Sequence, residues 1–266
     1  MKTNRRFLSI PYVLFLVIFV VFPLFVILKY AFTNENGVIS FENVITFFTS
    51  TNTLGTLVYS LVLAITTTIV CLLLGYPIAY ILARTEMKGR SVLLLAFVLP
   101  MWINFTLRIT ALKEILTVLE GNLSFHPFLN SVIGMTYDFL PFMILPMYTT
   151  LHKLDTSLIE AARDLGADQL KTFRKVILPL SIPGIISGIL MVFLPSMTNY
   201  VVLDMVYNKT YIMGSLIGAY FSAYDWHNGS IISVILLVFI LLTTLLSNRY
   251  QKDEKGGGLK HEKDYR

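Results

Sequence analysis

Six times along its length the chain carries an apolar run long enough to cross a lipid bilayer. A helix needs about 20 mostly apolar residues to span a hydrocarbon core of about 30 Å. The runs lie at residues 9–31, 57–83, 91–109, 132–150, 182–204 and 230–247. Charged residues make up only 14% of the chain, whereas a soluble domain carries roughly 25%. The sequence therefore predicts an all-α integral membrane protein with six transmembrane helices.

The first apolar run follows Lys2, Arg5 and Arg6, as the core of a signal peptide would. It is uncharged from Phe7 to Leu28, which is too long for such a core, and it lacks an obvious small-residue cleavage site. We therefore expect this segment to be retained as a span.

Basic residues alternate between the two sides of the membrane. Of the 21 lysines and arginines, 17 lie before the first run, in 84–90, in 153–175 and from residue 249 onward, and the other four, Lys29, Arg108, Lys113 and Lys209, lie on the opposite side. Cytoplasmic loops are enriched in Lys and Arg. Both termini are therefore predicted to be cytoplasmic, and this topology explains the net charge of +5 without nucleic acid.

Two segments outside the spans have their own patterns. Leu112, Ile115, Leu116 and Leu119 recur at helical spacing before Gly121, which predicts a short amphipathic helix on the outer side. Residues 1–250 then form the transmembrane domain. Residues 251–266 contain three glycines and mixed charges with no apolar face, so we expect a disordered cytoplasmic tail.

One long cytoplasmic loop, at about residues 151–179, predicts two short helices. Ser157 and Glu160 have the spacing of a capping box, in which each side chain bonds a free backbone amide of the first turn. Gly166 is placed to end that helix in a left-handed conformation. Asp168 is expected to cap a second helix, which Pro179 closes.

This loop resembles the EAA loop of the membrane subunits of bacterial ABC importers. Glu160-Ala161-Ala162, then Gly166, then Val176-Ile177-Leu178-Pro179 match its residue types, spacing and position before the last two spans, although Val176 stands where Ile is usual. The resemblance implies a type I ABC importer permease fold and a loop that docks on an ATPase subunit. The residues it assigns to ATPase coupling are Glu160, Ala161, Ala162, Asp164, Leu165, Gly166, Phe173 and Pro179. A capping role alone would also explain Glu160.

Further segments are similar to the spermidine/putrescine (PotB-type) branch of this family. They include Pro100-Met101-Trp102, Pro146 and Asp155, whereas residues 197–200 and 224–229 depart from that branch. The resemblance implies ATP-driven import of polyamines by alternating access across a bacterial inner membrane. It also implies a second, homologous permease subunit, two ATPase subunits and an extracytoplasmic binding protein. Spermidine and putrescine are not distinguished.

The chain lacks the parts of an enzyme. No G-x-x-x-x-G-K-[ST] loop occurs in it, so ATP and Mg²⁺ are expected on the partner ATPases, with no cofactor here. The four histidines are scattered, and Cys71 is the single cysteine, so no metal site is expected.

A path for a polycation should present spaced carboxylates and aromatic faces. The candidates for this path are Asp204, Asp138, Trp102, Tyr137, Tyr200, Asp225 and Trp226. Asp204 would lie roughly 33 Å from Ile182 if one helix joined them. Other interpretations stay open: Arg108 could pair with Asp138, the aromatic residues could form an interfacial belt, and Asp225 could be a solvated loop charge.

Two alternatives concern the whole chain. The same permease role could serve another cargo, such as iron, thiamine or sulfate. A secondary transporter, in which membrane acids relay protons, would act alone and would be expected to contain internal repeats, which the sequence does not clearly show.

Overall fold

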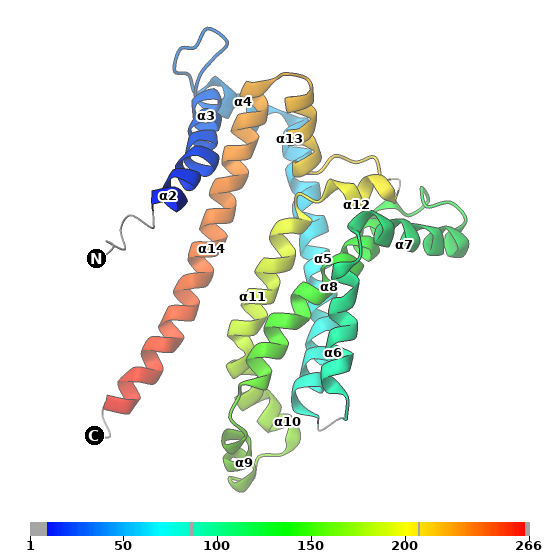
Figure 1. The fold of residues 1–266 in the computed structure, drawn as a ribbon, viewed down its shortest axis with the longest axis vertical. Helices are drawn as coiled ribbons and strands as arrows, with labels where there is room; N and C mark the ends of the chain where they lie inside the picture. The colour runs from blue at the N-terminus through cyan, green and yellow to red at the C-terminus, as the bar shows by residue number, and fades with distance from the viewer. Residues whose placement is uncertain (1–9, 86–87, 207, 264–266) are drawn as a thin grey trace, which may run out of the picture. The chain divides into compact units, whose positions relative to one another are not determined.

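The computed structural model describes residues 10–85, 88–206 and 208–263, with side chains as far as residue 245 (Figure 1). The described backbone is nearly all helical, with one isolated bridge between Thr33 and Ile39 in a loop. The all-α prediction is therefore confirmed. The basic residues before the first span and the last three residues of the tail lie outside the described part.

The chain divides into two compact units, residues 1–58 with 211–241, and residues 59–210 with 242–266. The first unit contains α2 (Ile10–Leu16), the wide turn η1 (Val17–Val21), α3 (Phe22–Ala31), α4 (Glu42–Thr49) and α13 (Met213–Ser222). The second contains α6 (Arg90–Val98), η2 (Leu99–Trp102), α7 (Phe105–Glu120), α8 (Pro127–His152), α9 (Thr156–Asp164), α10 (Gln169–Thr172), η3 (Phe173–Ile177), α11 (Leu178–Ser196) and α12 (Tyr200–Met205). Two long helices, α5 (Thr51–Arg84) and α14 (Trp226–Lys263), contribute to both units.

Five helical segments of the described chain are long and apolar enough to cross a membrane. They are Ile10–Ala31, Thr51–Arg84, Pro127–His152, Gln169–Ser196 and Trp226–Leu245. A sixth span exists if the pair Arg90–Trp102 and Phe105–Glu120, bent by 102°, counts as one. The protein thus has the multi-pass helical architecture that the sequence predicts.

The third predicted span, 91–109, is wrong in its second half because the helix breaks after Trp102. The side chain of Asn104 accepts hydrogen bonds from the amides of Thr106 and Leu107, at 3.0 and 3.4 Å, and so starts α7 in a new direction. The amphipathic helix therefore begins at Phe105 rather than near residue 112. It ends before Gly121, which has a positive φ of 78°, as expected.

The fifth predicted span, 182–204, is also interrupted. The carbonyl of Pro195 accepts hydrogen bonds from the amides of Thr198 and Asn199, at 3.0 and 2.9 Å, which closes α11 in a tight turn. Asp204 therefore lies on the separate helix α12, and the distance expected along one helix does not apply. At its other end the span begins earlier than predicted, because α10, η3 and α11 run on continuously from Gln169.

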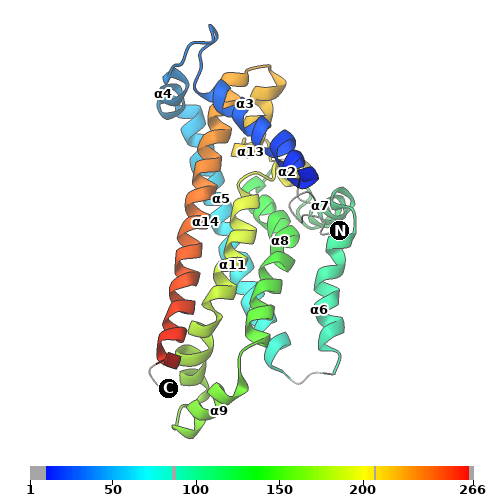
Figure 2. The same ribbon diagram turned by 60° about the vertical axis from the view of Figure 1, so that its left-hand side comes forward.

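The core of the second unit is the pair formed by α8 and α11, which lie side by side in both views (Figure 1 and Figure 2). α8 is continuous through Pro141 and Pro146. Gly184 and Gly188, one turn apart on α11, lie where a Cβ would come within 2.6 Å of Thr150 and 2.7 Å of Met143. Small residues at this spacing let two membrane helices approach closely.

The two ends of this pair carry different elements. α9 and α10 lie at one end of α8 and α11, and α7 and α12 lie at the opposite end (Figure 1). We refer to them below as the α9 end and the α7 end of the second unit.

The C-terminal tail differs from the expectation of disorder, because α14 continues as a helix to Lys263. Extending a formed helix costs far less than nucleating one, so the preceding span favours a helical continuation despite the glycines at 256–258. Residues 264–266 lie outside the described chain.

We predict that Gly184→Ala destabilises the protein by about 1–3 kcal/mol, since the added methyl group overlaps Thr150 and meets the backbone oxygen of Pro146. Thermal unfolding of the purified protein in detergent measures the effect. Gly55→Ala is the matched control, because a Cβ at Gly55 has nothing within 4 Å. Equal unfolding temperatures for the two variants would contradict close packing at Gly184.

Candidate functional site

Helix α9 is capped by Asp155, whose carboxylate accepts a hydrogen bond from the Ser157 amide at 2.9 Å. This bond lowers the pKa of the Asp155 carboxyl. The cap therefore stabilises α9 at neutral pH, and the stabilisation is lost as the pH falls through that lowered pKa.

The predicted capping box is wrong: Ser157 lies inside the first turn and Glu160 lies beyond the third helical position. Capping thus does not explain Glu160.

The corner after α9 is as predicted. Gly166 has φ +80°, a left-handed conformation that favours glycine, and its amide bonds to the carbonyl of Arg163 at 2.8 Å. Asp168 then caps α10 by accepting a hydrogen bond from the Lys171 amide at 2.7 Å. Two short helices therefore meet at a fixed glycine corner.

The outer surface of α9 is open to solvent. The helix has no buried residue, and Leu165 just after it is 89% exposed. Of the predicted coupling residues, Ala162 is half-buried, and Glu160, Ala161, Asp164, Leu165, Gly166 and Pro179 are exposed. Exposed apolar side chains on a projecting helix are typical of a protein interface.

Two coupling residues lie differently from the sequence prediction. Phe173, which the resemblance assigns to a loop that docks on an ATPase, is half-buried, with its ring against Tyr76 and Tyr80 of α5. Pro179 does not close the second helix. It lies in the first turn of α11, after a wide turn in which the Leu178 amide bonds to the Phe173 carbonyl, and a proline in a first turn is tolerated.

A buried ion pair lies at the α7 end. Arg108 of α7 binds one carboxylate oxygen of Asp138 on α8 at 2.5 Å, and the side-chain amide of Asn199 donates to the other at 3.3 Å. Both charged side chains are less than 8% exposed. The pairing that the sequence left open is therefore confirmed. It ties together α7, α8 and the break between α11 and α12.

The remaining candidates of the second unit are accessible. Trp102, at the end of η2, is 77% exposed, and Tyr137 lies with its ring centroid 5.8 Å from the Arg108 guanidinium. Tyr200 and Asp204 are exposed on the short helix α12. Of the predicted path residues, the structure brings Tyr137 and Asp138 together around Arg108, and Asp204 presents an exposed carboxylate.

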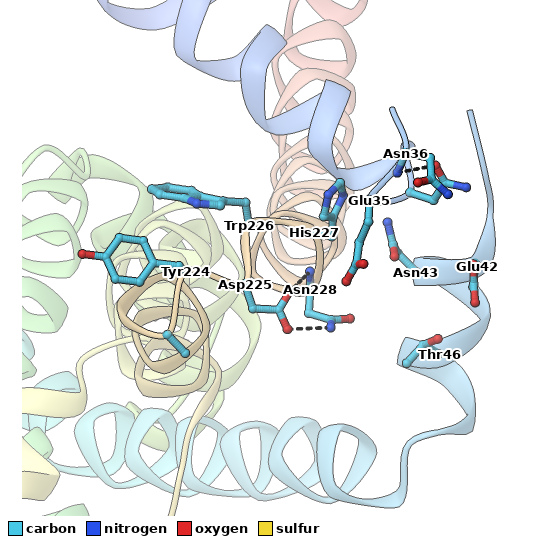
Figure 3. A pocket seen from close by; sticks show the side chains of 12 residues that line it. Glu35, Asn36, Glu42, Asn43, Thr46, Tyr224, Asp225, Trp226, His227 and Asn228 are labelled. Atoms are coloured by element: carbon cyan, nitrogen blue, oxygen red, sulfur yellow. Dashed lines mark hydrogen bonds between the residues drawn. The ribbon is translucent and has the colours of Figure 1, made fainter. Parts of the chain in front are cut away.

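Asp225 and Trp226 belong to the first unit, where they line a recess of about 780 Å³ (Figure 3). Asp225 is more than a solvated charge, because it accepts hydrogen bonds from the amide and the side chain of Asn228 at 3.1 and 2.8 Å. Glu35 and Glu42 line the same recess and were missed in the sequence. The sequence could have indicated these two residues only by their acidic side chains in the connection after the first span.

The described residues contain no group of three or more His, Cys, Asp or Glu placed to hold a metal ion. A set of membrane-length helices with a projecting exposed helix and a glycine corner fits the membrane subunit of a transport system. The chain belongs to the family of binding-protein-dependent transport system inner membrane components, which residues 72–252 match. It is a permease subunit of an ABC importer and a multi-pass protein of the bacterial inner membrane.

Named relatives cover most of the chain. The spermidine/putrescine transport system permease protein PotB of Haemophilus influenzae is 36% identical, over 94% of this chain and 96% of the relative. The PotB protein of Escherichia coli is 38% identical, over 71% of this chain and 75% of the relative. A PotB homolog of Mycoplasma pneumoniae is 30% identical, over 79% of this chain and 77% of the relative.

Solved structures share the fold at low identity. A bacterial ABC transporter that imports alginate matches with a TM-score of 0.66 and 17% identity, over 91% of this chain and 94% of that chain. The inward-facing MetNI methionine ABC transporter matches with a TM-score of 0.58 and 19% identity, over 77% of this chain and 98% of that chain. The fold is therefore that of type I ABC importer permeases.

We predict that Asp138→Asn lowers the free energy of unfolding by about 3 kcal/mol or more, because it leaves the charge of Arg108 buried without its partner. Thermal unfolding of the purified protein is the measurement. Arg108→Met with Asp138→Leu removes both charges and should recover most of the loss. Glu114→Gln, on the exposed side of α7, is the matched control. If Asp138→Asn unfolds like Glu114→Gln, the pair does not hold these helices together.

Proposed function

We propose that this permease subunit carries polyamines of the spermidine/putrescine class into the cell by alternating access. The observation that carries the proposal is the 36% identity to a PotB protein over 94% of the chain. That similarity includes the segments at both ends of the second unit as well as the coupling loop. A shared EAA loop alone would support a permease of any cargo.

The chemistry of the exposed candidates fits a flexible polycation. Ammonium groups bind carboxylates and aromatic faces, and sites that hold a moving substrate must release it again. Asp204 and Trp102 offer both kinds of group on exposed surfaces of the second unit, and Asp225 and Trp226 offer them in the recess of the first. Asp138 has both oxygens engaged by protein groups, so it is a weaker candidate for direct contact with cargo.

We further propose that α9 docks on a separate ATPase subunit at the cytoplasmic face, and that ATP and Mg²⁺ are bound by that partner. The supporting features are the absence of buried residues on α9 and the exposure of Leu165. The complete importer would contain a second permease, two ATPase subunits and an extracytoplasmic binding protein. Closure of the ATPases would then bias the spans between inward-facing and outward-facing states.

We predict that cells lacking this gene regain uptake of labelled spermidine or putrescine when it is restored, and that Asp204→Asn reduces the restored uptake severalfold. The reason is the loss of a carboxylate that attracts the ammonium groups. Glu114→Gln, an exposed acid on α7, is the control and should transport normally. Restoration of iron, thiamine or sulfate uptake instead would keep the permease role and overturn the polyamine cargo. Polyamine uptake by the chain without any ATPase would favour a secondary transporter.

We predict that Gly166→Val abolishes most uptake, while the protein still inserts in the membrane. Gly166 has φ +80° with no atom near its missing Cβ, so the cost of valine is the strained backbone rather than a clash. Gly166→Asn is the matched control, since asparagine tolerates the left-handed conformation and should keep most uptake. Normal uptake by the valine variant would count against a coupling role for this corner.

A further inference from the structure

Phe173 contacts two aromatic rings of a neighbouring span. Its ring centroid lies 6.0 Å from that of Tyr76 and 5.6 Å from that of Tyr80, with interplanar angles of 80° and 90°. Such edge-to-face contacts are the favoured geometry of aromatic pairs and add to the stabilisation from burial. Phe173 is thus fixed on α5 by two directional contacts. We call these three rings the aromatic clamp.

The spacing of the two tyrosines makes the clamp sensitive to position. Residues four apart lie one above the other on the same face of a helix, so Tyr76 and Tyr80 are one turn apart. A ring in contact with both cannot move along α5 by a full turn, about 5.4 Å, without losing at least one contact. Movement of Phe173 along α5 must therefore move α5 with it or break the clamp.

Two hydrogen bonds also join the clamp end of α5 to the segments before and after α9. The hydroxyls of Tyr76 and of Ser181 on α11 lie 3.0 Å apart, and Arg84 donates to the carbonyl of Leu154, just before α9, at 3.3 Å. Between residues 76 and 84 these contacts cover about 12 Å of α5. The segments before and after α9 are therefore both attached to one end of α5.

The clamp also lies at a weak point of α5. Pro77 falls between the two tyrosines, and it lacks the amide hydrogen that would bond to the preceding turn. Phe173 itself begins the wide turn η3, where the Leu178 amide bonds five residues back. Such wide turns inside helices are frequent at functional sites. Force applied to Phe173 would therefore reach α5 at the point where Pro77 leaves one backbone hydrogen bond of the helix unmade.

We propose that Phe173 is a positioning residue that passes the movement of α9 to α5 through the aromatic clamp, with α5 yielding at Pro77. The inference rests on the proposed coupling role of α9, and it gives Phe173 a different task from docking. The exposed Leu165 contacts the ATPase, and the half-buried Phe173 connects that contact to a span.

The test uses the complete importer, with its ATPase, second permease and binding protein, in lipid vesicles. ATP hydrolysis and import of labelled spermidine and putrescine are measured on the same vesicles. Phe173→Leu should leave the complex assembled and hydrolysing ATP, and should lower import per ATP on the order of tenfold, within the range of coupling between sites. Tyr80→Leu should do the same, and Tyr80→Phe, which keeps the ring, should behave like the wild type.

Phe128→Leu is the matched control. Phe128 makes a similar contact with Tyr59, with centroids 6.0 Å apart, near the other end of α5. Its import per ATP should stay near the wild-type value. An equal fall in this variant, or loss of import in Tyr80→Phe, would show that any disturbance of α5 has the effect and would overturn the clamp.

The Leu165→Asp variant distinguishes a failure of the clamp proposal from a failure of the coupling role on which it rests. If this variant imports normally, α9 does not dock and the proposed coupling fails. If it abolishes import while Phe173→Leu imports normally, coupling stands and the clamp is wrong. If wild-type vesicles import neither polyamine, the cargo is wrong. The clamp is then judged by stimulation of ATP hydrolysis by the binding protein, which Phe173→Leu should lower and Phe128→Leu should not.

Discussion

The close approach of α8 and α11 is the contact on which the second unit depends. In a bilayer, lipid tails are as apolar as leucine, so two helices gain little from apolar burial alone and associate through tight packing. Gly184 and Gly188 permit that packing along one face of α11. The exposed helix α9 lies at one end of the pair and the Arg108–Asp138 ion pair at the other. A change in how these two helices pack would therefore alter the structure at both ends of the pair.

Features that depend on local chemistry could be predicted from the sequence. The apolar runs identify the spans because hydrocarbon length and helix rise fix their size. Gly166 and Asp168 were recognised because a left-handed corner and a cap each require a particular residue type in the right place. The possible pairing of Arg108 with Asp138 followed from the cost of leaving either charge alone in a membrane.

The errors arose where two local signals compete or where a contact joins distant residues. Apolar periodicity continues past Trp102 and past Ser196, but Asn104 caps a new helix and the Pro195 carbonyl closes a turn. Ser157 fits a capping box, yet Asp155 offers a cap two residues earlier. Phe173 was assigned to docking because its contacts with Tyr76 and Tyr80 are about 95 residues away in sequence and have no local signature.

The pairing of Arg108 with Asp138 has a consequence for the energetics of a protein in an electric field. Moving one elementary charge across a membrane potential of 100 mV changes the free energy by about 2.3 kcal/mol. Arg108 and Asp138 carry opposite charges and are bonded to each other, so displacing them together moves no net charge. As long as the pair stays intact, rearrangement of α7 and α8 is insensitive to voltage at this point.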